Sequence, residues 1–200
     1  MSPASEMTTT TQHLTLAEYL NYSDSKDRCY ELVNGELVEM SPEWDFNSQI
    51  ASNLFAELLQ IVSSRLIRCK GTEIVVAGVR ATTRVPDLMV LSEELLLALR
   101  QSSRGTITLD MPPPVLVVEV VSPGKENEDR DYRYKRSEYA ARGIAEYWIV
   151  DPERAQVTVL VLVHGLYEEV VFRGSDRLIS QVFPTLQITA EQVLRAGELL

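Results

Sequence analysis

The sequence predicts an α/β fold built on a mixed β-sheet with flanking helices, with a β-hairpin toward each end of the chain. The strongest signal is residues 112–124, PPPVLVVEVVSPG, where the apolar run at 115–121 is typical of a strand buried on both faces. A helical pattern and a second apolar run follow, which predicts a strand–helix–strand unit at 115–151. Short alternating runs at 29–41 and 155–174 predict the two hairpins.

The first half of the chain mixes helices with short strands. Asn34-Gly35 is a preferred pair for a tight turn with positive φ, so it marks the centre of the first hairpin. Pro86 suits the start of a strand because it has no N–H to donate to a ladder. The predicted elements are a helix at 14–22, a hairpin at 29–41, an amphipathic helix at 46–66, and a strand, a bend and a strand through Leu88–Leu91 within 73–93.

The second half carries the strand–helix–strand unit and the second hairpin. Gly143 ends the helix of that unit, because glycine readily takes the left-handed conformation after a last helical turn. Crossovers between parallel strands are almost always right-handed, so we expect that hand here. The predicted elements are mostly loop with room for a helical turn at 94–111, a strand at 115–121, a helix at 127–143, a strand at 145–151, a hairpin at 155–174 and a helix at 190–199.

Length and composition predict one domain at 14–200, preceded by a flexible N-terminal tail at 1–13. The chain has 200 residues, of which 45% are hydrophobic and 24% charged, as is ordinary for a globular protein. The tail lacks the apolar stretch of a secretory signal, and no run of the chain is apolar enough to cross a bilayer. Two cysteines, Cys29 and Cys69, show no metal-ligand spacing, so we expect a soluble cytoplasmic protein.

The formal net charge of −10 argues against a protein that coats nucleic acid through a bulk positive field. It is compatible with an enzyme that meets nucleic acid through a local patch, and acids gathered around a metal would add to this balance. Basic residues do cluster at 125–142, but acids interleave with them. That mixture favours a solvated helix face with ion pairs over a dedicated DNA patch.

Glu119 is an unexpected residue inside the apolar run at 115–121. An isolated buried carboxylate is costly, so such a group is paired, neutralised or bound to a metal. Pairing with an arginine near a strand end is one interpretation. Asp87, at the start of the strand in RVPDLMVL, supports another, because acids on neighbouring strands can converge on a hard cation such as Mg²⁺. Taken alone, Asp87 is equally well explained as a turn residue, since Pro-Asp is a frequent turn pair.

Lys135 is the third candidate. Asp131, Lys135 and Tyr139 are spaced at i, i+4 and i+8, so they share one face of the predicted helix. One interpretation is a surface ion pair between Asp131 and Lys135. In the other, Lys135 reaches over the end of the strand at 115–121, where its ammonium can hold a water or balance phosphate charge.

Four segments resemble one known family: YELVNGELVEMSP, RVPDLMVLSE, PPVLVVEVVSPG and DYRYKRSEYAARGIAEYWIVDP. They are similar to the Uma-type family of restriction endonucleases, bacterial proteins first catalogued as a domain of unknown function within the PD-(D/E)XK nuclease superfamily. The resemblance runs from about Thr15 to the C-terminus. Such a dispersed set is fairly specific, whereas a bare PD…E match is weak. It implies a restriction-endonuclease-like mixed sheet flanked by helices.

The resemblance implies a catalytic role for three residues. Asp87 matches the PD aspartate, and Glu119 matches the acid of the (D/E)XK element, so both are implied metal ligands, with the backbone carbonyl of Val120 as a third. Val121 occupies the lysine position of that element and cannot serve. In this family the lysine looks to have moved to the following helix, where Lys135 stands.

Further residues are implied less directly. Glu31 matches an acidic position and is either an extra metal or water contact or a polar residue on the outer face of the hairpin. Asn47 stands where the family has a histidine, and it can equally belong to the N-cap region of a helix. Arg84, beside the PD aspartate, either contacts phosphate or pairs with an acid. Arg133 is a second candidate for substrate binding.

The function implied is a Mg²⁺-dependent endonuclease, with Mn²⁺ as a substitute, that hydrolyses DNA phosphodiester bonds. The alternative is a catalytically inactive binding or regulatory module that kept the nuclease fold. The acidic composition and the missing lysine beside Glu119 favour the alternative, and the intact Asp–Glu–Lys set favours the enzyme. A homodimer is expected from the resemblance, because related nucleases often pair to cut two strands.

The tryptophans and histidines are predicted to be structural. Trp44 and Trp148 are expected to pack rather than to stack on bases, with Trp148 inside a strand pattern. His13 lies in the predicted tail and His164 in the turn of the second hairpin. No nucleophile elbow, phosphate-binding glycine loop or zinc-ligand spacing occurs in the sequence.

Overall fold

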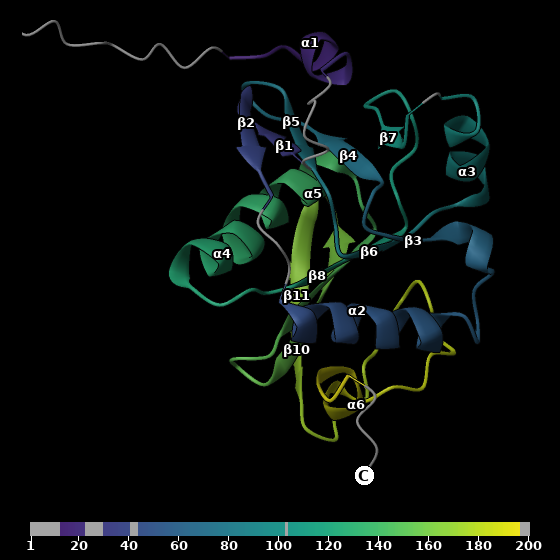
Figure 1. The fold of residues 1–200 in the computed structure, drawn as a ribbon. Helices are drawn as coiled ribbons and strands as arrows, with labels where there is room; N and C mark the ends of the chain where they lie inside the picture. Colours follow the sequence, from purple (N-terminus) through teal and green to yellow (C-terminus); the bar gives the residue numbers. More distant parts are fainter. Residues whose placement is uncertain (1–12, 23–29, 41–43, 103, 197–200) are drawn as a thin grey trace, which may run out of the picture.

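The structure, a computed structural model, describes residues 13–22, 30–40, 44–102 and 104–196 (Figure 1). The predicted tail lies outside these residues except for His13, and so does Cys29. The helices are α1 (Leu16–Leu20), α2 (Asp45–Leu58), η1 (Ser64–Leu66), α3 (Glu93–Leu99), α4 (Lys125–Asp129), η2 (Arg130–Lys135), α5 (Arg136–Arg142) and α6 (Ala190–Leu194). The strands are β1 (Tyr30–Val33), β2 (Glu36–Glu39), β3 (Ile67–Cys69), β4 (Glu73–Val76), β5 (Thr82–Arg84), β6 (Leu88–Val90), β7 (Thr106–Ile107), β8 (Leu116–Val120), β9 (Glu146–Asp151), β10 (Gln156–Val163) and β11 (Leu166–Arg173).

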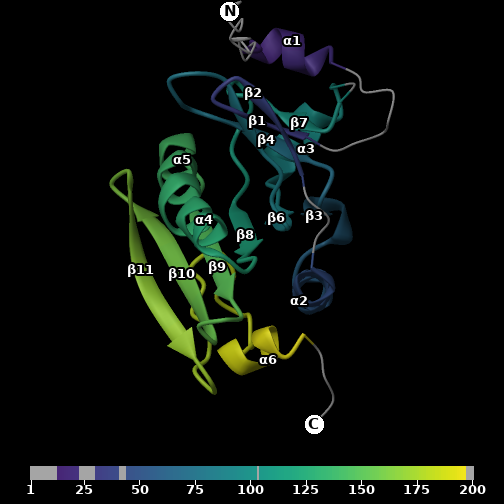
Figure 2. The ribbon, with the colours of Figure 1, turned by 60° about the vertical axis from the view of Figure 1, so that its left-hand side comes forward.

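Six strands form the main sheet, in the order β11-β10-β9-β8-β6-β3 (Figure 2). β8 and β9 run parallel, and the other neighbouring pairs run antiparallel. The sheet is therefore mixed, as the sequence predicts, and its parallel pair is the strand–helix–strand unit at 115–151. A smaller sheet holds β5-β4-β7, and β1 pairs with β2 in a two-stranded sheet.

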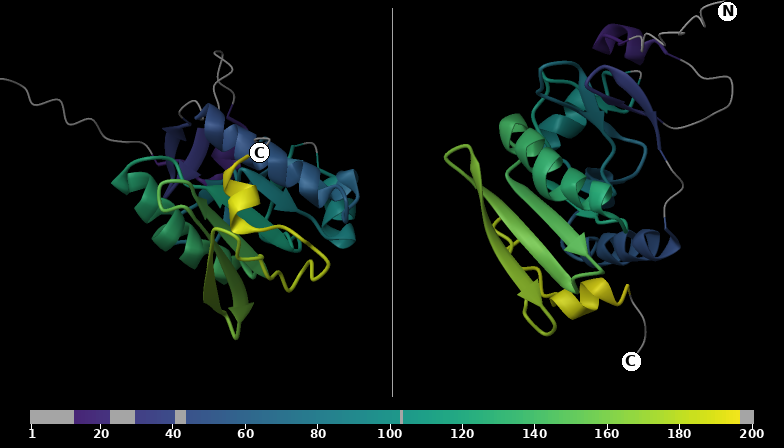
Figure 3. Two further views of the ribbon diagram at one scale, coloured as in Figure 1. Left: turned by 90° about the horizontal axis from the view of Figure 1, so that it is seen from below. Right: turned by 90° about the vertical axis from the view of Figure 1, so that its left-hand side faces the viewer.

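Each face of the main sheet is covered by its own hydrophobic core. Figure 3 shows the arrangement of the helices and strands from two further sides. α2 and α6 cover one face, while α3, α5 and the small sheet contribute to the core on the other. Along β8, Val118 and Val120 belong to the α2 core, whereas Val117 and Val121 belong to the α5 core. Because side chains alternate along a strand, Glu119 faces the α5 side.

Both predicted hairpins are confirmed. β1 and β2 turn at Asn34 and Gly35, with φ of 51° and 85°. β10 and β11 turn at His164 and Gly165, with φ of 50° and 84°. Positive φ at both central residues gives a turn whose twist matches that of the flanking strands, which explains why these dipeptides mark the turns.

The long helix predicted at 46–66 is wrong at its C-terminal end, because α2 stops at Leu58. Short-range bonds from Gln60 N to Glu57 O and from Ile61 N to Leu58 O close it, at 3.2 and 3.0 Å. The residues that follow, IVSS, are β-branched or serine and favour the helix weakly. The chain then enters β3, which the sequence analysis missed.

The region 94–111 is more ordered than predicted. Ser92 caps α3, accepting a hydrogen bond from Leu95 N at 3.0 Å. β7 adds a two-residue strand parallel to β4, and β5 also went unpredicted. Strands this short leave too few residues for an alternating pattern to be read. The last helix, expected at 190–199, ends at Leu194, and residues 197–200 lie outside the described part of the chain.

The helix predicted at 127–143 is confirmed with one local difference. It begins at Lys125, and Gly143 ends it with φ of 81°. Its middle, η2, is a π-helical segment, in which each turn holds an extra residue. Such segments are frequent at functional sites. Among the residues that the structure describes, no helix has the length and apolar character needed to span a membrane.

Candidate active site

Glu119 is buried in the middle of the main sheet, with 3% of its surface exposed. The Tyr139 hydroxyl donates to its Oε1 at 2.6 Å, and the Lys135 ammonium lies 2.8 Å from its Oε2. The partners of this carboxylate are thus a lysine and a tyrosine of the following helix rather than the arginine of the alternative interpretation.

Lys135 is held between two carboxylates. Its ammonium lies 3.1 Å from Asp131 Oδ1 as well as 2.8 Å from Glu119, and all three side chains are at most 4% exposed. The interpretation of Asp131 and Lys135 as a surface ion pair is therefore wrong. Burial alone lowers the pKa of a lysine, but Asp131 and Glu119 outweigh it and raise the pKa of Lys135. This ammonium is charged throughout the neutral range.

Asp87, the residue before β6, lies next to Glu119 of the neighbouring strand β8. Leu88 pairs with Val118 in the antiparallel ladder of β6 and β8, and one more step of that register sets Asp87 beside Glu119. Asp87 Oδ2 accepts a hydrogen bond from Val120 N at 2.7 Å, which fixes the carboxylate at the end of β8. The two acids therefore lie next to each other, and both line one pocket.

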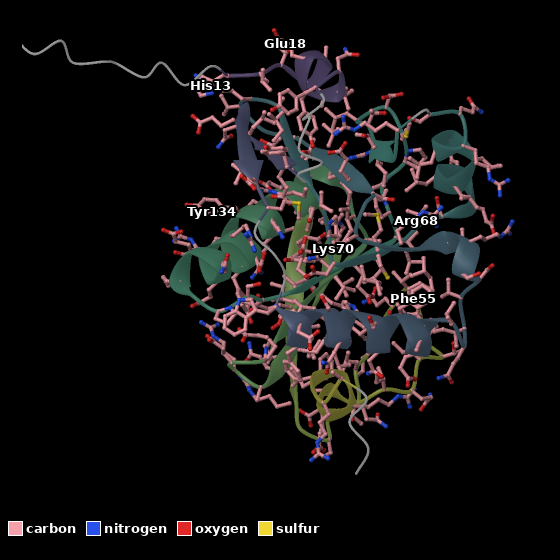
Figure 4. All side chains as sticks on the ribbon, viewed as in Figure 1. His13, Glu18, Phe55, Arg68, Lys70 and Tyr134 are labelled. Carbon is pink, nitrogen blue, oxygen red and sulfur yellow. The ribbon has the colours of Figure 1, made fainter. Side chains whose placement is uncertain are left out.

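Lys70 is a residue of this site that sequence analysis missed. Its ammonium lies 3.3 Å from Asp87 Oδ1, and its side chain is 39% exposed. Cys69 pairs with Leu88 in β3 and β6, so one further step sets Lys70 opposite Asp87. Figure 4 shows Lys70 over the middle of the fold. The register of β3 would have revealed this lysine, but a three-residue strand gave no readable signal.

Burial raises the pKa of the Glu119 carboxyl to about 8, and the charges of Asp87 and Asp131 act in the same direction. Lys135 opposes this shift, but it is shared with Asp131 and balances only one negative charge. The ionised Glu119 thus lacks a full counter-charge, and further positive charge near it would be favourable.

A stability difference that depends on pH follows from this shift. The folded-state pKa of Glu119 lies above its ordinary value of 4.5, at about 8. The folded chain therefore binds more protons than the unfolded chain in that interval, and this contribution to stability is lost as the pH rises through the folded pKa. We expect the thermal midpoint of wild type to fall relative to that of Glu119→Gln between about pH 5 and about pH 9, by roughly 10 °C.

The measurement is thermal unfolding followed by circular dichroism at each pH without divalent metal. Glu153→Gln is the matched control, because Glu153 is exposed, and its difference from wild type should not vary with pH. A constant difference between wild type and Glu119→Gln would contradict the raised pKa.

One pocket of about 360 Å³ is lined by the side chains of the candidate site. Carboxylates of Glu31, Asp87 and Glu119 and cations of Lys70, Arg130 and Lys135 meet there, and β2 and Trp44 also contribute to its lining. The oxygen donors fit a hard cation such as Mg²⁺. Within the described ranges, no group of three or more His, Cys, Asp and Glu side chains is placed to hold a metal. A metal here could take two carboxylates, with water and substrate oxygens as its other ligands.

Glu31 is buried, so its assignment to the outer hairpin face is wrong. It is 8% exposed, lines the pocket, and accepts hydrogen bonds from Val85 N at 2.9 Å and Arg84 Nη1 at 3.2 Å. Arg84 also donates to both oxygens of Glu138, at 2.7 and 2.8 Å. Arg84 therefore pairs with acids, which is the second of its two sequence interpretations, and it joins β1 to α5.

Asn47 ties the start of α2 to the end of β8. Its Nδ2 lies 3.3 Å from Val120 O and 3.2 Å from Ser122 Oγ, and the side chain is buried. It is not a cap, because the N-cap residue is Trp44, whose side chain makes no cap bond. The carbonyl that the resemblance implies as a metal ligand is thus also the acceptor of a buried amide.

Arg133 stands apart from the pocket. Its side chain is 69% exposed and lies 3.6 Å from Asp129, and it is not among the pocket-lining residues of the described chain. Lys125 likewise lies 3.2 Å from Asp129 with 71% of its side chain exposed. These pairs agree with the interpretation of a solvated helix face. Arg130 differs, because it lines the pocket.

The two tryptophans differ in burial. Trp148 is fully buried and donates to Glu146, so its structural assignment is confirmed. For Trp44 that assignment is wrong, because 61% of its surface is exposed and it lines the pocket. His164 lies in the β10–β11 turn as predicted. His13 is within 2.6 Å of Arg80.

The fold is a mixed α/β class, with a six-stranded sheet and helices on both of its faces. A crystal structure of a "putative nuclease belonging to DUF820" from Anabaena variabilis ATCC 29413 is similar, with a TM-score of 0.67 over 92% of this chain and 98% of that chain. The sequences are 16% identical, so this likeness shows a shared fold.

The family model described as "Putative restriction endonuclease" (Uma2) matches residues 16–191, and the chain belongs to this family. The family resemblance predicted from the sequence is confirmed. None of the curated proteins matches the chain.

Proposed function

We propose that the protein is a metal-dependent endonuclease that hydrolyses phosphodiester bonds of DNA. One observation carries this proposal: Asp87 and Glu119 lie opposite each other at one pocket, with the Lys135 ammonium 2.8 Å from Glu119. Two acids that could hold a metal ion, with an ammonium beside them, suit metal-assisted hydrolysis of a phosphodiester. Membership of a restriction endonuclease family agrees with this function.

Asp87 and Glu119 would hold Mg²⁺, or Mn²⁺ in its place, with the carbonyl of Val120 as a further oxygen donor. When bound, the ion polarises the phosphate and lowers the pKa of a coordinated water. The raised pKa of Glu119 and the nearby charges of Asp87 and Asp131 support a cation at this position. Magnesium commonly binds through one or two carboxylates, so this donor set is sufficient.

The other residues of the site orient the Glu119 carboxylate and balance the negative charge of the phosphate. Tyr139 and Lys135 each hold one oxygen of Glu119, which fixes the plane of that carboxylate. The Lys135 ammonium balances negative charge that develops on the phosphate. Lys70 is the more exposed lysine and can reach a phosphate oxygen entering the pocket. Glu31, anchored by Val85 N, supplies a carboxylate for a water on the hairpin side.

A binding or regulatory module without turnover is the second candidate. The observation that favours it is the burial of Lys135, which is 3% exposed and already held by two acids. The chain also carries a net charge of −10, which weakens attraction to DNA.

Two measurements on the wild-type protein separate these candidates. The first is calorimetric titration with Mn²⁺ and Mg²⁺, where we expect one site per chain. The second is nicking of supercoiled plasmid at several salt concentrations, where we expect cleavage with Mg²⁺ and none with a chelator. Metal binding without nicking at any salt concentration would favour the inactive module, and failure to bind either metal would contradict the proposed site.

Two further parts of the proposal come from the family resemblance. We propose that 14–200 is one domain with a restriction-endonuclease-like core. We also propose that the protein forms a homodimer, because related nucleases often pair to cut two strands. Sedimentation equilibrium would measure the mass of the assembly.

A further inference from the structure

Trp44 is an exposed aromatic side chain at a charged pocket. It is 61% exposed and lines the same pocket as Asp87 and Glu119. Burying a tryptophan would stabilise the fold by removing a large apolar area from water. A tryptophan kept in water beside acids and lysines therefore points to a flat apolar ligand group that binds next to a charged one.

The position of Trp44 is fixed relative to the two acids. Its carbonyl accepts the first bonds of α2, from Asn47 N at 3.0 Å and Ser48 N at 3.2 Å. Asn47 in turn holds the end of β8 through Val120 O, one residue after Glu119. The backbone of Trp44 is thus tied to the residue that joins α2 to the end of β8, and its side chain lines the pocket of the two acids, so a group resting on the indole lies next to them.

The surface around the pocket offers little net positive charge for binding a DNA duplex, because its cations lie close to acids. Outside the pocket, Lys125 and Arg133 both lie close to Asp129, and Arg154 pairs with Glu128. Duplex DNA is bound mainly by many cations that neutralise phosphates, and the net charge of −10 opposes such binding. Stacking of a base on an aromatic ring adds binding energy beyond the contacts between cations and phosphates, and it requires a base whose face is free.

We infer that Trp44 is a stacking platform for an unpaired nucleobase, and that the substrate is a single-stranded or locally unpaired segment of nucleic acid. The inference rests on the proposed function, because it places the phosphate next to that base at Asp87 and Glu119. Lys70 and Arg130 line the same pocket and would contact the adjoining phosphates.

The test compares the binding of a single-stranded oligodeoxynucleotide with that of the matching duplex. Binding is monitored through tryptophan fluorescence, in the absence of metal. The chain has two tryptophans, and Trp148 is fully buried, so quenching by a stacked base reports on Trp44. We expect the single strand to quench and to bind more tightly than the duplex. Trp44→Ala should weaken its binding roughly 5- to 100-fold, measured by anisotropy of a labelled strand. Trp44→Phe should keep most of the affinity.

Phe46→Ala is the matched control. Phe46 is 39% exposed and lies two residues away on α2, but it does not line the pocket, so its loss should change affinity less than about twofold. The inference is overturned if Trp44→Ala binds the single strand like wild type, if the duplex binds as tightly, or if no strand binds.

These outcomes are distinct from those of the proposed function. Trp44-dependent binding by a protein that never cuts would refute the nuclease and leave the platform in place. Metal-dependent cutting of a duplex at the same rate by wild type and Trp44→Ala would refute the platform and leave the nuclease.

Discussion

Glu119→Gln is expected to lower Mg²⁺-dependent cleavage by more than about 100-fold, because altering even an outer partner of a metal ligand costs 10- to 100-fold. Glutamine has the same shape, and its amide oxygen can still accept the Tyr139 hydroxyl, which now lies 2.6 Å from Glu119 Oε1. It has no negative charge and only one oxygen, so it binds a cation poorly. The measurements are the rate of plasmid nicking and the affinity for Mn²⁺.

The fold of this variant should remain intact. Lys135 keeps Asp131 at 3.1 Å, so its ammonium retains one counter-charge. The exposed Glu153→Gln is the control and should cut like wild type. Cleavage by Glu119→Gln at the wild-type rate, with Mg²⁺ present and an unchanged circular dichroism spectrum, would refute the assignment of Glu119 as a metal ligand.

Lys135→Met is expected to destabilise the protein by about 3–5 kcal/mol, the usual effect of removing one partner from a buried ion pair. Methionine fills much the same volume, but it leaves Glu119 and Asp131 buried without their shared cation. Urea unfolding in the absence of metal measures the change. Lys125→Met is the matched control, because Lys125 is 71% exposed and its pairs with acids lie on the surface. Its effect should stay below about 1 kcal/mol.

A double-mutant cycle separates lost charge from lost packing. Asp131→Asn removes one of the two acids, so Lys135→Met should be less damaging in that background, with a coupling of about 1–3 kcal/mol. If Lys135→Met destabilises both backgrounds equally, the pair between Lys135 and Asp131 contributes nothing to stability.

Signals that are local in sequence were predictable. The apolar run of β8, the turn dipeptide Asn34-Gly35 and the stop at Gly143 each act through the chain next to them, and each is confirmed. That Asp87 and Glu119 lie close together was also predictable, because Asp87 comes directly before β6 and Glu119 lies within β8, the strand that pairs with it.

What depends on contacts between distant elements was not predictable. Lys70 follows a three-residue strand whose partner, β6, lies about twenty residues further along the chain. The burial of Arg84 depends on Glu31 from one element and Glu138 from another. The sequence predicts that Trp44 packs, because an apolar side chain is normally buried. Only the neighbours of Trp44 in space place it at a pocket.

Lys70, Asp87 and Glu119 are aligned by the registers of β3, β6 and β8. The number of residues in these segments therefore matters to the site as much as the identity of the three side chains. Successive side chains of a strand point to opposite faces, so inserting or deleting one residue just before any of the three would turn that group to the far side of the sheet. Related sequences can therefore differ in the residues around the pocket. Insertions or deletions of one residue in these three segments should occur only in relatives that have lost the activity of the site.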